Sequence, residues 1–200
     1  MTAGEGLGGG LATGVDEHLT VTSTGQMREL GRRLAGVLRA GDLVILSGPL
    51  GAGKTTLAQG IGAGLGVRGP ITSPTFVIAR VHPSLRNGPD LVHADAYRLG
   101  SKAEVDDLDL DADLATSVTI VEWGEGLVEN LAASYLEVNI QAEPVGAEPV
   151  AAEPVNAEQA AAEIGPGTTV TEAMAADDAE TPRYVHLRGW GDRWASVSPF

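Results

Sequence analysis

Apolar residues recur along the chain with two different periods, and these periods predict its secondary structure. Over residues 26–39 the apolar side chains fall three or four positions apart, which predicts an amphipathic helix. Thr24 is the expected N-cap of this helix, and Gly41 is its expected end. Further helices are predicted over residues 56–63 and 125–133.

Strands are predicted where apolar residues run without interruption or alternate with polar ones. Residues 43–47 form an apolar run typical of a buried strand, whereas residues 135–141 alternate as in a strand with one buried face. The predicted strands span residues 18–22, 43–47, 76–81, 91–94, 117–121, 135–141, 184–188 and 194–197. Strands interleaved with helices indicate a chain of the α/β class.

The composition of the chain changes sharply in its last third. Residues 142–156 repeat AEPVG, AEPVA and AEPVN, and a proline at every fifth position is incompatible with a continuous helix or a central strand. We therefore expect residues 142–182 to be an acidic, disordered insertion that joins two strands of one domain. This insertion would separate residues 18–141 from C-terminal strands at 183–200, and residues 1–17 are expected to be a disordered glycine-rich tail.

The formal charge of −14 belongs largely to this insertion. Residues 142–182 contain nine acidic and no basic residues, so the rest of the chain carries a charge of only −5. The acidity argues against a dedicated nucleic-acid surface, which would need a basic stripe. Because the chain has no cysteine, disulfides and thiol nucleophiles are excluded. It shows neither an apolar run of membrane-spanning length nor a secretory signal, so we expect a cytoplasmic protein without a membrane partner.

One segment carries a specific chemical pattern. The residues GPLGAGKTT match the phosphate-binding pattern G-x-x-x-x-G-K-[ST] and lie between a predicted buried strand and a predicted helix. Glycines let backbone N–H groups turn toward phosphate oxygens, and the helix N-terminus adds its positive end. Lys54 can reach the β and γ phosphates, and the Thr55 hydroxyl can coordinate Mg²⁺. The nucleotide-binding residues predicted in this loop are Gly48, Gly51, Ala52, Gly53, Lys54, Thr55 and Thr56.

Two carboxylates follow predicted strands at positions suited to phosphoryl transfer. Asp95 follows the strand at 91–94, and Glu122 follows the strand at 117–121. Because ligands of α/β sheets lie at the carboxyl ends of strands, both acids are expected to face the phosphates. They could hold Mg²⁺ and orient an attacking water, although either one alone could also be a solvated turn acid. His93 is open to two interpretations, a catalytic base or a packed strand residue.

Four motifs, GPLGAGKTT, SPTF, HADAYR and VEWGE, occur in this order, and together they resemble the TsaE family. These are small bacterial P-loop ATPases of tRNA threonylcarbamoyladenosine biosynthesis. The resemblance covers about residues 19–141 and resumes weakly at Arg183. It implies an α/β fold with a mainly parallel P-loop NTPase-like sheet flanked by antiparallel strands and helices. It also implies Mg²⁺-dependent ATP hydrolysis that supports repeated turnover by TsaB-like and TsaD-like partners, with only indirect contact to tRNA.

The resemblance assigns roles to individual positions. Lys54 and Thr55 would bind phosphate and metal, Glu122 would join the magnesium shell, and Asp95 would be the carboxylate required for hydrolysis. Trp123 would lie close to the nucleotide. A switch-like loop near the γ-phosphate and the partner surface would consist of Ser73, Pro74, Thr75 and Phe76.

Two positions depart from the family's usual pattern. Pro49 stands in the loop where an aspartate is common, which leaves the glycines and the lysine intact. Met27 stands where a threonine is frequent, so Thr22 or Thr24 is a candidate for the adenine-side hydroxyl. Binding is therefore expected to survive the change at Pro49, whereas any role of the aspartate is lost.

Two other functions stay open at this point. A P-loop small-molecule kinase would have a similar size and loop, but no Lys or Arg occurs between Lys102 and Arg183 to form an arginine-rich lid. A non-catalytic module that recruits partners when nucleotide is bound would need the P-loop but not Asp95.

Overall fold

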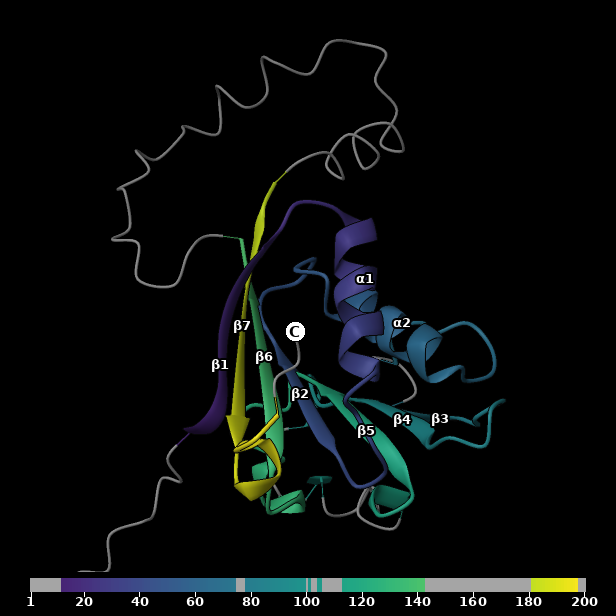
Figure 1. The fold of residues 1–200 in the computed structure, drawn as a ribbon. Coiled ribbons are helices and arrows are strands. Elements are labelled where there is room, and N and C mark those ends of the chain that lie inside the picture. Colours follow the sequence, from purple (N-terminus) through teal and green to yellow (C-terminus); the bar gives the residue numbers. More distant parts are fainter. Residues whose placement is uncertain are drawn as a thin grey trace, which may run out of the picture.

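A seven-stranded sheet with helices on one face forms the framework of the molecule. The structure is a computed structural model, and it describes residues 12–74, 78–99, 101, 104–105, 113–142 and 181–197. The strands are β1 (Ala12–Val21), β2 (Leu43–Ser47), β3 (Ala79–His82), β4 (Asp90–Asp95), β5 (Ser117–Glu122), β6 (Tyr135–Gln141) and β7 (Arg183–Trp190). The helices are α1 (Thr24–Ala35) and α2 (Lys54–Leu65), with 3-10 turns η1 (Glu129–Leu131) and η2 (Asp192–Trp194). Figure 1 shows α1 and α2 packed together on one face of the sheet.

The strand order is β1-β7-β6-β2-β5-β4-β3. The four central strands β6, β2, β5 and β4 run parallel, whereas β3 at one edge and β7 with β1 at the other pair antiparallel. A parallel centre with antiparallel edges confirms the predicted fold class. The carboxyl ends of β2, β4 and β5 consequently meet at one edge of the sheet.

Each face of the sheet buries its own set of apolar side chains. Along β2, Val44 and Leu46 belong to the core that includes α1 and α2, whereas Leu43 and Ile45 belong to a second core on the opposite face. This full burial is typical of a central parallel strand. Gly60 of α2 lies so close to α1 that a Cβ atom there would stand 2.2 Å from a carbonyl oxygen of α1. The tight helix crossing fixes α2 and the loop that leads into it.

The N-terminal strand is longer than its alternation predicts. β1 begins at Ala12 rather than at residue 18, so the prediction of a disordered tail over 1–17 is wrong from Ala12 onward. β7 supplies a pairing partner from Trp190, opposite Ala12, with an irregularity in the register just after Ala12. This partner lies far away in the sequence, so local composition could not reveal it.

The helices differ from the prediction at their ends. Ser23 rather than Thr24 is the N-cap of α1, because its hydroxyl accepts a 3.2 Å hydrogen bond from the Gln26 N–H. The helix ends before Gly36 rather than Gly41, since the apolar pattern continues past a residue of low helix propensity. α2 begins at Lys54, earlier than the predicted residue 56.

Two predicted elements are wrong. Only the short turn η1 forms within the helix predicted over 125–133, where Gly126 takes a φ of +79° that a helix cannot accommodate. The strand predicted over 194–197 is replaced by η2 and a turn, which bury Trp194 completely against the core. In both segments the conformation follows from glycine turns and tertiary packing rather than from periodicity.

The predicted insertion joins two neighbouring strands. β6 ends at Gln141 opposite Tyr184 of the antiparallel strand β7, so the segment between them begins and ends at the same edge of the domain. This pairing is as predicted, while residues 143–180 lie outside the described residues. Over the described ranges, every helix is too short or too polar to cross a membrane.

Candidate functional site

The glycine-rich loop lies between the end of β2 and the start of α2, as its pattern predicts. Gly48 has a φ of +131°, and a Cβ atom there would stand 2.1 Å from the Ile140 carbonyl oxygen, so glycine is required at this position. Gly53 is the N-cap of α2, and in the described structure no side chain caps this end. The first N–H groups of α2 therefore give the loop the positive end of the helix dipole.

The ammonium of Lys54 is buried at the centre of the loop. Its Nζ donates hydrogen bonds of 2.8 Å to the Gly48 carbonyl and 2.9 Å to the Pro49 carbonyl. The same atom lies 3.9 Å from the centre of the Trp123 ring, a cation–π distance. Burial lowers the pKa of Lys54, although the carboxylates of Glu122 and Asp95 oppose the shift. Carbonyl dipoles and an aromatic face thus hold a positive charge where the loop opens.

Glu122 links the loop to the end of β5. Its Oε1 accepts a 2.9 Å hydrogen bond from the Thr55 hydroxyl and lies 2.9 Å from Nε2 of His93. His93 is fully buried, and its Nδ1 has no partner among the described residues. The contact with Glu122 favours a third interpretation over the two considered from sequence. His93 is a positioning residue that holds the Glu122 carboxylate in place at the site.

Asp95 lies beside Glu122 at the sheet edge. The two residues are register partners on β4 and β5, so both acids follow their strands to the same place, as expected. Asp95 is buried, and its Oδ1 accepts a 2.8 Å hydrogen bond from the Tyr97 N–H. Trp123 follows Glu122 with a φ of +60°, a strained value for a bulky residue, and its ring lies 5.3 Å from that of Tyr97.

These residues line one open cleft of about 260 Å³. Its walls are Leu50, Gly51, Ala52, Gly53, Lys54, Thr55, Thr56, Ser73, Asp95, Glu122 and Trp123. Of the four residues of the predicted switch loop, Ser73 lines the cleft, and Pro74, the next residue, is buried. Thr75 and Phe76 lie outside the described residues. All other predicted site residues meet here, with Gly48 at the base of the loop.

A second cavity of about 110 Å³ shares the loop with this cleft. It is lined by Val21, Thr22, Ser23, Thr24, Met27, Gly51, Ala52, Gly53, Thr56, Thr181 and Arg183. The candidates Thr22 and Thr24 therefore lie beside the loop. Sequence reasoning missed Thr181 and Arg183, although Arg183 is the first basic residue after a long acidic stretch, a signal that could have drawn attention to it.

The two hollows together provide complementary chemistry around one loop. A buried ammonium and a helix N-terminus attract an anion such as a polyphosphate. A hydroxyl and two carboxylates nearby are oxygen ligands of the kind that Mg²⁺ prefers. The second cavity adds hydroxyl and apolar surfaces for the remainder of an elongated ligand.

Known proteins resemble this chain along most of its length. The family model described as "Threonylcarbamoyl adenosine biosynthesis protein TsaE" matches residues 21–148. The tRNA threonylcarbamoyladenosine biosynthesis protein TsaE of Streptomyces coelicolor is 52% identical over 172 residues, which cover 86% of this chain and 95% of that protein. The protein of the same name from Mycobacterium tuberculosis is 51% identical over 143 residues, covering 67% of this chain and 80% of that one. The crystal structure of Bacillus subtilis YdiB shares the fold, with a TM-score of 0.58 at 21% identity over 91% of this chain and 92% of that chain.

Proposed function

Since the chain belongs to the TsaE family and has its role in tRNA threonylcarbamoyladenosine biosynthesis, we propose that it binds and hydrolyses ATP with Mg²⁺ in that pathway. The hydrolysis would support repeated turnover by the partners that transfer the threonylcarbamoyl group. The protein would then be an accessory ATPase whose own substrate is the nucleotide.

The hydrogen bond between Thr55 and Glu122 is the observation that carries this proposal. It joins the first turn of α2 to the end of β5, directly beside the buried ammonium of Lys54. A loop that only bound phosphate would need the lysine and the backbone N–H groups. A carboxylate paired to the loop hydroxyl adds the ligand set that a hard cation requires.

The residues of the cleft fit a magnesium ion by their chemistry. The Thr55 hydroxyl and the Glu122 carboxylate would hold the ion together with phosphate oxygens and water. When bound, Mg²⁺ would neutralise charge that develops on the transferred phosphoryl group. His93 would keep the Glu122 carboxylate oriented through its 2.9 Å contact.

Asp95 is assigned the role of orienting the attacking water. Its carboxylate lies in the cleft next to Glu122, and the Tyr97 N–H restrains one of its two oxygens. The second cavity would take the nucleoside, with Thr22 or Thr24 as hydroxyl contacts and Arg183 as a charged one. The phosphates would then run from this cavity along the loop to the cleft.

TsaB-like and TsaD-like proteins are proposed as partners that stimulate the activity. Leu50 lines the cleft yet is 93% exposed, and Tyr97 packs near Trp123 at 65% exposure. Large apolar side chains at the rim of a site are suited to contact with another protein. A partner seated there could reach the loop and sense the bound nucleotide.

The variant Asp95→Asn tests the proposal in the full-length protein assayed with its partners. We expect phosphate release to fall by about a hundredfold or more, while the affinity for ATP changes only a few-fold. Asp90→Asn is the matched control, because Asp90 lies at the opposite end of the same strand and should leave phosphate release near wild type.

Two outcomes would support other functions. Phosphoryl transfer to a small-molecule acceptor that outpaces hydrolysis would indicate a kinase. Normal tRNA modification in cells that carry Asp95→Asn would indicate a module that acts by nucleotide binding alone.

A further inference from the structure

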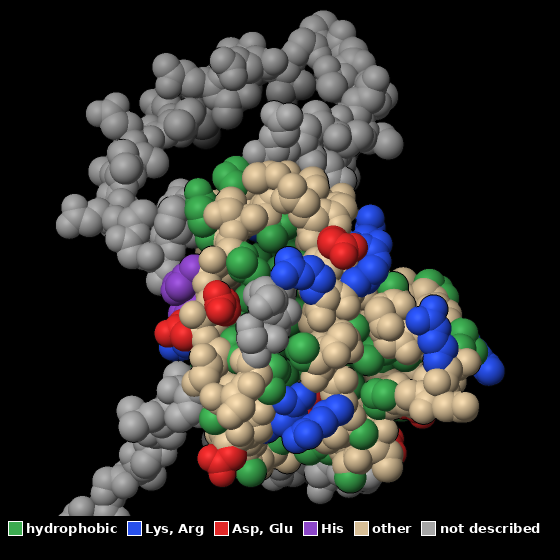
Figure 2. Space-filling view, in the orientation of Figure 1, with side chains coloured by type: hydrophobic (Ala, Val, Ile, Leu, Met, Phe, Trp, Pro, Cys, Tyr) green, Lys and Arg blue, Asp and Glu red, His purple; other side chains and the backbone are tan. Residues whose placement is uncertain are grey.

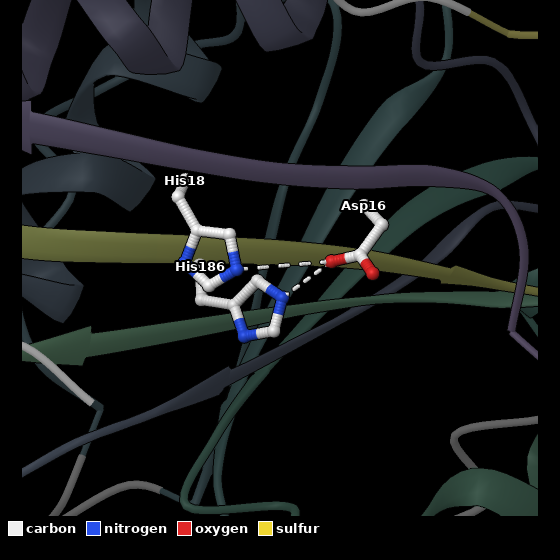
Figure 3. A group of neighbouring side chains, drawn as sticks. All are labelled: Asp16, His18 and His186. Atoms are coloured by element: carbon white, nitrogen blue, oxygen red, sulfur yellow. Dashed lines mark hydrogen bonds and ion pairs between the residues drawn. The ribbon is translucent and has the colours of Figure 1, made fainter. Parts of the chain in front are cut away.

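Two histidines and an aspartate form a cluster on the outer strands β1 and β7, in a part of the sheet that the cleft does not include. His18 and His186 are direct register partners across the two strands. Asp16 lies two residues before His18, so it projects from the same face of β1. Figure 3 shows the three side chains converging, with one Asp16 oxygen directed at a nitrogen of each ring.

The distances in the cluster suit a shared metal ion. One ligand atom from each of the three residues lies within 4.8 Å of the other two. The Asp16 Oδ1 is 2.6 Å from Nε2 of His186 and 4.0 Å from Nε2 of His18. Ligands about 2.1 Å from a tetrahedral ion lie about 3.4 Å apart, a spacing between these two distances. Side-chain rotations alone, without movement of the strands, would therefore bring all three atoms onto one ion.

The two rings lie against each other, with a nitrogen of each near the aspartate. The imidazoles of His18 and His186 are stacked, with centroids 3.9 Å apart and an angle of 16° between the planes. In this stack Nε2 of each ring lies on the side of the aspartate (Figure 3), and rotation of one ring out of the stack would let both in-plane lone pairs meet at one ion. Strand pairing fixes the backbone positions, so the reorganisation on metal binding would be confined to the side chains.

The surroundings leave the cluster accessible to solvent and to ions. The side chains of His18 and Asp16 are 68% and 65% exposed, and that of His186 is 18% exposed. Figure 2 shows histidine side chains at the surface beside acidic ones along the β1 edge of the molecule. The basic group opposite Asp16 in the register, Arg188, is paired with Glu137 at 3.0 Å. Its charge is thereby partly balanced.

We propose that Asp16, His18 and His186 bind one divalent transition-metal ion of the type that prefers imidazole, such as Zn²⁺. Two imidazole nitrogens and a carboxylate oxygen are a common ligand set for Zn²⁺, with water completing the coordination. The chain has no cysteine and four histidines, of which His82 and His93 are buried, so this cluster is the favoured position for such an ion. The ion would tie β1 to β7 next to the strand ends that lead into the second cavity.

Calorimetric titration of the full-length, untagged protein with Zn²⁺ tests the assignment, with excess Mg²⁺ present to occupy sites for hard cations. We expect one ion per chain with micromolar affinity. His18→Ala and His186→Gln should each weaken binding about tenfold or more. Glu17→Gln is the matched control, because Glu17 lies between Asp16 and His18 on β1 but projects to the other face of the strand. The affinity of this variant for Zn²⁺ should equal that of wild type.

A second measurement keeps the test independent of folding. Electron paramagnetic resonance of the protein loaded with Cu²⁺ should show coupling to two imidazole nitrogens, and His18→Ala, whose side chain is mostly exposed, should lose one of them. An affinity of wild type no higher than that of the double variant His18→Ala/His186→Gln would overturn the assignment. A Cu²⁺ spectrum without two imidazole nitrogens would do so as well.

Discussion

Arg193→Ala is expected to destabilise the domain strongly, because Arg193 ties the C-terminal segment to the loop between α1 and β2. Its guanidinium donates two hydrogen bonds of 3.0 Å to the Asp42 carboxylate. A third, of 2.6 Å, goes to the Val37 carbonyl oxygen. The side chains of Arg193 and Asp42 are 13% and 4% exposed, so alanine would leave a buried carboxylate without its opposite charge.

The expected cost follows from this burial. Removing one member of a buried ion pair costs about 3–5 kcal/mol, because the remaining charge is uncompensated. In a protein of this size the loss corresponds to a decrease in melting temperature of about 6–20 °C. The control Arg32→Ala removes a 2.9 Å pair with Glu29 on the surface of α1, where the two side chains are 47% and 61% exposed. Its cost should be about 0.5 kcal/mol or less.

Urea unfolding followed by circular dichroism measures both variants against wild type. The double variant Asp42→Ala/Arg193→Ala should lose less free energy of unfolding than the two single variants lose in sum, since it leaves no unpaired charge. A loss below about 1 kcal/mol for Arg193→Ala would refute the reasoning, because it would mean that water or another cation takes over the role of the guanidinium.

Three further predictions concern the loop, the response to pH and the insertion. Gly48→Ala should cost about 1–3 kcal/mol of stability and abolish ATP binding in a fluorescent-nucleotide assay, whereas Gly41→Ala, also at positive φ but in open space, should retain binding. Burial lowers the pKa of His82 below its usual value of 6.5, so the unfolded chain takes up a proton on this side chain more readily than the folded protein. The stability that neutral His82 contributes is therefore complete above pH 6.5 and is lost as the pH falls below it. Between pH 7.5 and 5.5 the melting temperature of His82→Gln should consequently fall less than that of wild type. Replacing residues 143–180 by a short Gly-Ser linker should raise the free energy of unfolding by about 1–2 kcal/mol, because a shorter loop costs less entropy to close. Phosphate release should stay unchanged. Loss of partner binding would show instead that the insertion is a docking element.

The sequence predicts best those parts of the site that depend on local patterns. The apolar runs that become β2, β4 and β5 mark buried strands by composition alone. Because parallel strands end at a common edge, the acids after two of them, Asp95 and Glu122, were expected at the same edge of the sheet; the register adds that they are direct neighbours. The loop pattern likewise predicts its own position between β2 and α2.

The contacts that local patterns do not specify are those between distant segments. The hydrogen bond from Thr55 to Glu122 spans 67 positions, and that from His186 to Asp16 spans 170. The partner of His93 was open to interpretation because an alternating strand residue can point to either face until the sheet order is known. The length of β1 likewise depends on a distant segment, because its pairing with β7 extends it beyond the predicted strand.

The pairing of β1 with β7 also determines what an insertion can change at the site. Thr181 and Arg183 line the second cavity together with Val21, so the start of β7 and the residues just before it line the same cavity as the end of β1. The insertion therefore rejoins the domain at the wall of the second cavity, although its other end follows β6. A shortened linker must consequently preserve residues 181–183. A variant that removed them would weaken ATP binding through the lost cavity wall, and this effect would be mistaken for a function of the insertion itself.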